Sequence, residues 1–395
     1  MTSRAVAVDE ANVPPLKMDH RRAWVVMTAS FLALMIESGL RPSLGVYFLH
    51  FLNTFNCTKS QVASVYGAIN ASCFISGPIA GIFYKMFGAR AAVMIGGLLA
   101  ATGYFLIVFT STIYQVIVLG IAIGVGSGLI RTATVSVQPE YFLKYRNLAM
   151  GVVFIGPGLG IFIFPHVIGY LVEHFAWRGS LVFVSALVLQ CVVLGALLKP
   201  RRHRQSHHAG LKDFMALTLW KNPLFVLQGM GMFLAAGCCF IYFAFDITLM
   251  QHRGLSEEEA LFTFSMHGIF SLLGRFVAIA VVQWEDMNIT IFMALCYLTA
   301  QIPMFSGVFC YNRIMFTIQN SLTGFGNGLF PVALAPFLIY IGGVENLPVA
   351  LGYSNFLNGI GGLAILEVGG KRTPYEYDMF HFPDRVIITR YTHMC

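Results

Sequence analysis

The sequence predicts an all-α membrane protein, on the evidence of its composition and its apolar runs. Hydrophobic residues make up 57% of the 395-residue chain, 11% of the residues are charged, and the mean hydropathy is +0.72. A soluble domain usually carries about 25% charged residues. A soluble fold this apolar would expose far more hydrophobic surface than water tolerates. The composition also excludes a disordered chain and a small disulfide scaffold.

Apolar runs recur along the chain at the length of about 20 residues that a helix needs to cross lipid. A long polar stretch at 199–222 separates six runs from five. We therefore predict an N-terminal arm (1–22), a six-helix bundle (23–198), a basic loop (199–222), a five-helix bundle (223–366) and a polar tail (367–395). The eleven runs are approximately 23–50, 61–84, 91–110, 113–136, 147–171, 179–198, 223–249, 259–284, 288–309, 313–341 and 347–366.

The basic residues indicate how the chain is oriented. They gather in the N-terminal arm and after the second, fourth and sixth runs, and the segment 199–222 holds six Lys and Arg against the single acid Asp213. Cytoplasmic loops carry this excess, so we expect a cytoplasmic N-terminus. The net charge of +7 then reflects topology, and we predict no nucleic-acid partner. The eight cysteines show no CxxC or other metal spacing, so neither a metal nor a cofactor is predicted.

The first motif follows the second apolar run. The segment from Gly81 through Lys85 and Gly88 to Arg90 reads GIFYKMFGAR. The glycines permit a tight turn between packed helices, and the cations can meet helix C-termini on the cytoplasmic face. A plain positively charged loop is the alternative. The spacing resembles the loop signature of the major facilitator superfamily.

Three further motifs resemble the monocarboxylate transporter family. YFLKYRNLAMG covers residues 141–151, continues to GPGLG at 156–160, and looks like the entry to that family's helix five. FAWRGS at 175–180 resembles the start of its helix six. The motif that opens helix one survives as Asp19 and Trp24, without its glycines. The signature positions are Asp19, Trp24, Gly81, Lys85, Gly88, Arg90, Tyr141, Phe142, Lys144, Arg146 and Gly151. We assign the glycines at 151 and 156–160 to helix packing and rocking.

This resemblance implies a major facilitator fold of two bundles with twelve spans, of which eleven are predicted here. It implies a plasma-membrane transporter that moves monocarboxylates or related carboxylate-bearing solutes, such as aromatic amino acids and hormones, by alternating access. Some members require a single-span glycoprotein chaperone, so such a partner is a candidate. We find no paired catalytic groups and no charge rings of a channel, so neither an enzyme nor a channel is predicted.

Ionisable residues inside the spans are candidate sites, because lipid makes them costly. Arg275 lies in mid-span without an acid in reach along its own run, and its guanidinium suits a carboxylate. The resemblance implies that this arginine holds the substrate carboxylate. Ser271 replaces an aspartate that proton-coupled members carry four residues earlier, which argues against their coupling chemistry. We group Arg275 and Ser271 with Arg41 as the substrate site; the alternative for Arg275 is a structural ion pair.

Two acids are candidates for proton coupling. Glu37 stands four residues before Arg41, the favourable order for an ion pair within a helix, so a purely structural pair is the alternative. Asp246 lies in the seventh run. Arg131, near the end of the fourth run, either lines a central cavity or reaches the cytoplasmic interface, and we expect the interface.

The resemblance ends near Gly362. The polar tail 367–395 departs from the family and replaces its twelfth span. The alternative function is therefore a transport-impaired isoform, truncated at this end, that acts only as a membrane binding partner.

Overall fold

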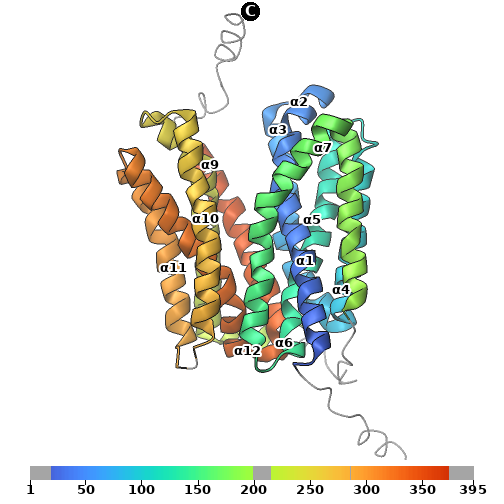
Figure 1. Cartoon of the computed structure of the whole chain (residues 1–395), viewed down its shortest axis with the longest axis vertical. Coiled ribbons are helices and arrows are strands. Elements are labelled where there is room, and N and C mark those ends of the chain that lie inside the picture. The colour runs from blue at the N-terminus through green and yellow to red at the C-terminus, as the bar shows by residue number, and fades with distance from the viewer. Residues whose placement is uncertain (1–18, 199–214, 285, 373–395) are drawn as a thin grey trace, which may run out of the picture.

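A computed structural model describes residues 19–198, 215–284 and 286–372, and Figure 1 shows the course of the chain. The predicted arm up to residue 18, the basic loop at 199–214 and the tail from residue 373 lie outside the described residues. Within the described ranges all regular secondary structure is helical. The elements are α1 (Arg21–Ser43), η1 (Leu44–Tyr47), α2 (Phe48–Phe55), α3 (Lys59–Ile75), α4 (Gly77–Ile107), α5 (Ile113–Ser136), α6 (Gln138–Tyr141), α7 (Arg146–Leu197), η2 (Leu217–Lys221), α9 (Pro223–His252), α10 (Glu257–Val282), α11 (Ile289–Ser306), η3 (Gly307–Phe309) and α12 (Arg313–Arg372).

Three long helices each contain a break between two predicted apolar runs. The backbone leaves helical geometry at Gly88 in α4, at Ala176 in α7 and at Gly343 in α12, all with positive φ. Glycine adopts this conformation readily, whereas Ala176 (φ 55°, ψ 170°) is strained. Seven helical segments of the described chain are long and apolar enough to cross a membrane. Divided at the breaks, the helices follow the predicted runs in order.

Polar caps fix where several helices begin. Thr58, Thr112 and Ser256 each form a capping box with a Gln or Glu three residues later. Asn222 and Asn288 accept hydrogen bonds from the first backbone N–H groups of α9 and α11. These side chains satisfy donors that a helix start leaves free, so the helix ends coincide with the polar connections between apolar runs.

The helices form two bundles. In Figure 1, α1–α5 and α7 lie on the right, α9–α12 lie on the left, and the two groups approach each other most closely at the end where α1 begins. Within the first bundle, α1 packs on α7 through Gly39 and Gly160, whose backbones touch so closely that a Cβ on either would clash. Small residues allow this approach, and dispersion contacts between the close backbones stabilise the pair.

The last helix extends past the predicted start of the polar tail. Helix α12 continues through Glu367 to Arg372, whereas the apolar run ends near residue 366. Hydropathy locates the end of the apolar surface, and helical hydrogen bonding continues beyond it.

Candidate functional site

The candidate site is built around three buried or half-buried arginines from three helices. Arg41 comes from α1, Arg131 from α5 and Arg275 from α10. Arg131 lies within electrostatic range of the other two. The three guanidiniums therefore place positive charge inside the helical assembly. Each such charge needs an anionic partner, supplied either by the protein or by a bound solute.

Arg275 has no ion pair among the residues that the structure describes. Its side chain is 9% exposed, and its buried Nε and Nη1 have no hydrogen-bond acceptor among the residues the structure describes. Ser271, one turn earlier on α10, is half-buried, and its backbone oxygen lies against Gly328 of α12. The predicted structural ion pair for Arg275 is absent from the described part of the chain. A buried guanidinium left in this state suits an incoming carboxylate.

The glycines of the 141–160 motif face two different neighbours. Gly156 and Gly160 contact α1 at Phe31, Met35 and Gly39, as predicted for packing. Gly158 instead faces the second bundle, where a Cβ would overlap Nη1 of Arg275. Residues two apart on a helix point about 200° from each other, so the alternating glycines serve opposite faces. Gly151, seven residues before Gly158, lies on that second face, and a Cβ there would overlap Ile279 of α10.

Arg41 is paired within its own bundle. Its Nε lies 3.4 Å from Oε1 of Glu37, which confirms the ion pair expected from the spacing. Its Nη1 donates to Oδ1 of Asn70 at 3.1 Å, and Ser38 donates to Oε2 of Glu37 at 2.5 Å. This arrangement makes Arg41 and Glu37 a neutral pair, so neither is as available to a solute as Arg275.

Arg131 lies beside an aromatic ring that it shares with Arg41. Its guanidinium lies 5.4 Å from the ring centroid of Phe74 in α3, and Arg41 lies 5.4 Å from the same ring. The two cations therefore approach each other across the faces of α1, α3 and α5. The expectation that Arg131 reaches the cytoplasmic interface stays a prediction.

A second buried polar cluster lies in the other bundle around Asp246 of α9. Asn320 of α12 donates from Nδ2 to Oδ2 of Asp246 at 3.0 Å. Tyr242 donates to Oδ1 of Asn320 and lies 3.3 Å from Nδ1 of His267 on α10. Asp246 has no ion pair among the described residues, so its carboxyl is bound only by neutral groups.

A cavity of about 270 Å³ lies against Phe74. Its walls come mainly from α9, α11 and α12, and they combine aromatic and apolar side chains with amides. Because the ring of Phe74 also contacts Arg41 and Arg131, the cavity adjoins these two arginines; Arg275 is not among its lining residues. The lining residues are Phe74, Met232, Ala235, Ala236, Cys239, Phe243, Tyr297, Ala300, Gln301, Asn327, Phe330 and Asn358.

The motif that opens helix one contacts the helix-five motif. Asp19 donates its backbone N–H to the oxygen of Tyr141 at 3.1 Å, and its Oδ2 accepts from the backbone N–H of Lys144 at 3.2 Å. Trp24 packs edge-on against Phe142 with ring centroids 5.4 Å apart. The surviving Asp and Trp of this motif therefore hold α1 to the start of α7.

The 81–90 motif joins the two bundles. Nζ of Lys85 donates to Oδ1 of Asn346 in α12 at 2.7 Å. One turn earlier, Gly81 packs on the backbone of Pro348. Gly88 makes the break in α4, and Arg90 follows it with an exposed side chain. In the helix-five motif, Arg146 donates from Nε to the backbone oxygen of Phe142 at 3.4 Å.

Sequence reasoning did not identify Phe74, Tyr242 or Asn320 as site residues. Their side chains are uncharged, so they lack the cost in lipid that singled out the arginines and acids. The Gln319-Asn320 amide pair inside an apolar run was the available signal, since buried amides need partners.

Known proteins share this arrangement and parts of this sequence. Residues 26–365 match the family model of the Major Facilitator Superfamily. Monocarboxylate transporter 13 of Bos taurus is 31% identical over 253 residues, which cover 64% of this chain and 59% of that protein. Monocarboxylate transporter 12 of Homo sapiens is 23% identical over 391 residues, with 88% and 74% coverage. The crystal structure of the transporter FucP in the outward conformation has a TM-score of 0.69 at 17% identity, with 89% and 92% coverage.

The family model and the fold identify a multi-pass membrane transporter and not an enzyme. The chain belongs to the Major Facilitator Superfamily. Within that superfamily its sequence is similar to monocarboxylate transporters 12 and 13. The likeness to FucP concerns the fold. The matched part of the chain spans 59% of the length of the bovine relative.

Proposed function

We propose that the chain is a secondary transporter for small monocarboxylates or related carboxylate-bearing solutes, including aromatic amino acids and hormone-like acids. It acts at the plasma membrane with its N-terminus in the cytoplasm, and it works by alternating access. The observation that carries the proposal is Arg275, a buried guanidinium whose Nε and Nη1 have no acceptor among the described residues. Two relatives are named as monocarboxylate transporters, which supports the solute class.

The substrate carboxylate binds the guanidinium of Arg275. The planar fork of donors can hold both oxygens at once, which a lysine cannot do. Arg131 adds a second positive charge within electrostatic range. Arg41 assists only when its pair with Glu37 opens, because the pair already satisfies its charge. Ser271, one turn from Arg275, can supply a hydroxyl to the same solute.

The apolar body of the substrate occupies the cavity of about 270 Å³ beside Phe74. The aromatic walls favour a ring or a branched apolar group, and the amides of Gln301, Asn327 and Asn358 can hydrogen-bond to polar substituents. This combination supports an amphiphilic carboxylate as substrate.

Transport requires the two bundles to separate at the end where α1 begins. Contacts that join them there include Lys85 with Asn346, Gly81 with Pro348, and the amide of Asn147 with the backbone oxygen of Val282 at 3.0 Å. Rocking of one bundle against the other breaks these contacts and opens the site to the cytoplasm.

If transport is coupled to protons, Asp246 is the better carrier of the two predicted acids. Its carboxyl is 5% exposed and bonded to the neutral amide of Asn320. Glu37 instead lies 3.4 Å from the guanidinium of Arg41. A neutral, protonated carboxyl needs no counter-ion in a buried site, so Asp246 can take up a proton without leaving a cation unpaired.

Uptake by proteoliposomes tests the proposal. Radiolabelled lactate, phenylalanine and a thyroid-hormone analogue are compared with and without an imposed pH gradient, and with and without a co-expressed single-span glycoprotein. Saturable uptake of at least one solute, lost in Arg275→Ala and partly kept in Arg275→Lys, is the expected result. If vesicles that contain the folded protein accumulate none of these solutes, the transport proposal is wrong, and the role of a membrane binding partner is the one that remains.

A further inference from the structure

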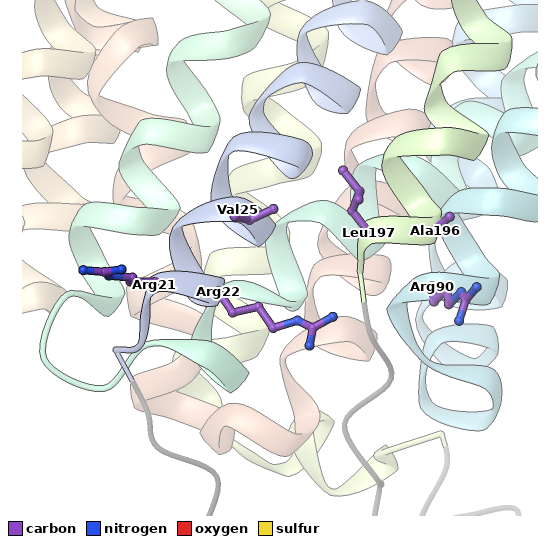
Figure 2. Close-up of a pocket in the computed structure, with 6 residues that line it drawn as sticks. All are labelled: Arg21, Arg22, Val25, Arg90, Ala196 and Leu197. Atoms are coloured by element: carbon purple, nitrogen blue, oxygen red, sulfur yellow. The ribbon is translucent and has the colours of Figure 1, made fainter.

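A second hollow lies at the end of the first bundle where α1 begins, away from the central arginines. It has a volume of about 570 Å³ and lies between the first turn of α1, the start of the second half of α4 and the last turn of α7. Figure 2 shows Arg22 and Arg90 on either side of Leu197, while Arg21 extends from the other side of the first turn of α1. The remaining lining residues are Val25 and Ala196.

The described lining of this hollow is positively charged. Three of its six lining residues are arginines and, among the residues that the structure describes, none is an acid; the side chains of Arg22 and Arg90 face the hollow, whereas that of Arg21 points away from them (Figure 2). Arg21 and Arg22 stand in the first turn of α1, and Arg90 stands two residues after the break at Gly88, at the beginning of a helical segment. Helix N-termini carry partial positive charge, so cations there are normally disfavoured. Asp19, the nearest acid along the chain to Arg21, instead directs Oδ2 to the backbone of Lys144.

The remaining walls are apolar and open to the surroundings. Val25 is 50% exposed and Leu197 is 46% exposed. A water-soluble anion would gain nothing from these side chains. A phospholipid places its phosphate among the arginines and its glycerol and acyl chain against the apolar walls. Arginine forks bind phosphate through paired hydrogen bonds, and basic pockets between membrane helices on the cytoplasmic side hold anionic headgroups.

We propose that this hollow is a binding site for an anionic phospholipid, with the phosphate held by Arg22 and Arg90. The proposal rests on the proposed orientation, since anionic lipids concentrate in the cytoplasmic leaflet. The lipid site does not depend on which solute is transported. A negative lipid-binding result and a negative uptake result can therefore be told apart. A bound lipid would tie α1 to α4 and α7 at the end where the bundles meet.

Native mass spectrometry of the purified full chain in detergent measures this binding directly. Phosphatidylserine and phosphatidylcholine are titrated separately, and folding is checked by size exclusion. The parent should prefer phosphatidylserine. The double variant Arg22→Gln/Arg90→Gln should bind it roughly 30-fold more weakly, because each basic residue near such a headgroup contributes about a fivefold gain in affinity. The control Arg253→Gln/Arg313→Gln, which removes two exposed cations at the end of α9 and the start of α12, should bind like the parent.

Two further measurements separate a lipid from a simple anion. Val25→Ser keeps every charge and should weaken long-chain phosphatidylserine by about threefold while leaving a short-chain analogue unaffected. Inorganic phosphate at millimolar concentration should fail to displace the lipid. Equal binding of both lipids by the parent, an unchanged preference in the folded glutamine double variant, or displacement by inorganic phosphate would each overturn the proposal. If the double variant does not fold, the Val25→Ser comparison decides.

Discussion

The contact between Gly158 and Arg275 gives the sharpest prediction about the site. A methyl group at residue 158 would overlap Nη1 of Arg275 and would lie 2.6 Å from Cδ2 of Leu272. Since carbon atoms in van der Waals contact are about 3.5–4.0 Å apart, the guanidinium must move. Gly158→Ala therefore displaces the proposed carboxylate ligand without removing its charge.

The expected cost follows from overpacking in a well-packed interior, which is about 1–3 kcal/mol. If the displacement falls on the bound state, the affinity for the solute drops by roughly 5- to 150-fold. The assay is the concentration dependence of uptake by proteoliposomes, with thermal unfolding recorded on the same samples. The prediction is a raised KM, with a melting temperature lowered by no more than a cost of about 1–3 kcal/mol implies.

Gly169→Ala is the matched control, because Gly169 lies on the same helix and a Cβ there meets nothing within 4 Å. Its KM should equal that of the parent. Combining Gly158→Ala with Arg275→Lys should cost less than the sum of the two single changes, since the shorter branch of lysine avoids the methyl group. A Gly158→Ala protein with the parent KM would refute the packing and the assignment of Arg275 together.

Three other changes test separate parts of the molecule. Glu37→Gln leaves Arg41 as an uncompensated buried charge and should destabilise the fold by about 3 kcal/mol in thermal or denaturant unfolding, whereas an unchanged stability would show that the pair is not buried. The asparagine of Asp246→Asn cannot take up a proton, so solute uptake by this variant should lose the stimulation that an inward pH gradient gives the parent. Retained stimulation would show that a group other than Asp246 carries the proton. Ala176→Gly relieves a backbone conformation that favours glycine at an exposed position, and it should stabilise the protein by about 1 kcal/mol. A less stable Ala176→Gly protein would contradict the strained geometry at that break.

The helices could be predicted from sequence because lipid imposes a length and an apolar composition on each span. The breaks at Gly88, Ala176 and Gly343 fall between predicted runs, and two of them lie at glycines. The Glu37–Arg41 pair was also predictable, since its partners are four residues apart on one helix. These features depend on neighbours close in sequence.

Contacts between helices could not be predicted in the same way. The motif glycines were assigned to packing, yet Gly158 faces Arg275 of the other bundle, because the rotation of a helix depends on partners far along the chain. The contact of Arg131 with Phe74 could not be predicted, since the two residues lie on different helices far apart in the sequence. Asn320 was missed because an uncharged amide hardly alters the hydropathy of an apolar run.

The central claim is that the guanidinium of Arg275 recognises a carboxylate. Equilibrium binding of a transported acid and of its uncharged carboxamide, measured on the purified parent and on Arg275→Gln, tests that claim directly. The parent should bind the acid at least about 30-fold more tightly than the amide, since losing one partner of a buried charged pair costs about 2 kcal/mol or more. Arg275→Gln should bind the two equally. A folded Arg275→Gln protein that still prefers the acid by the parent ratio would contradict the account.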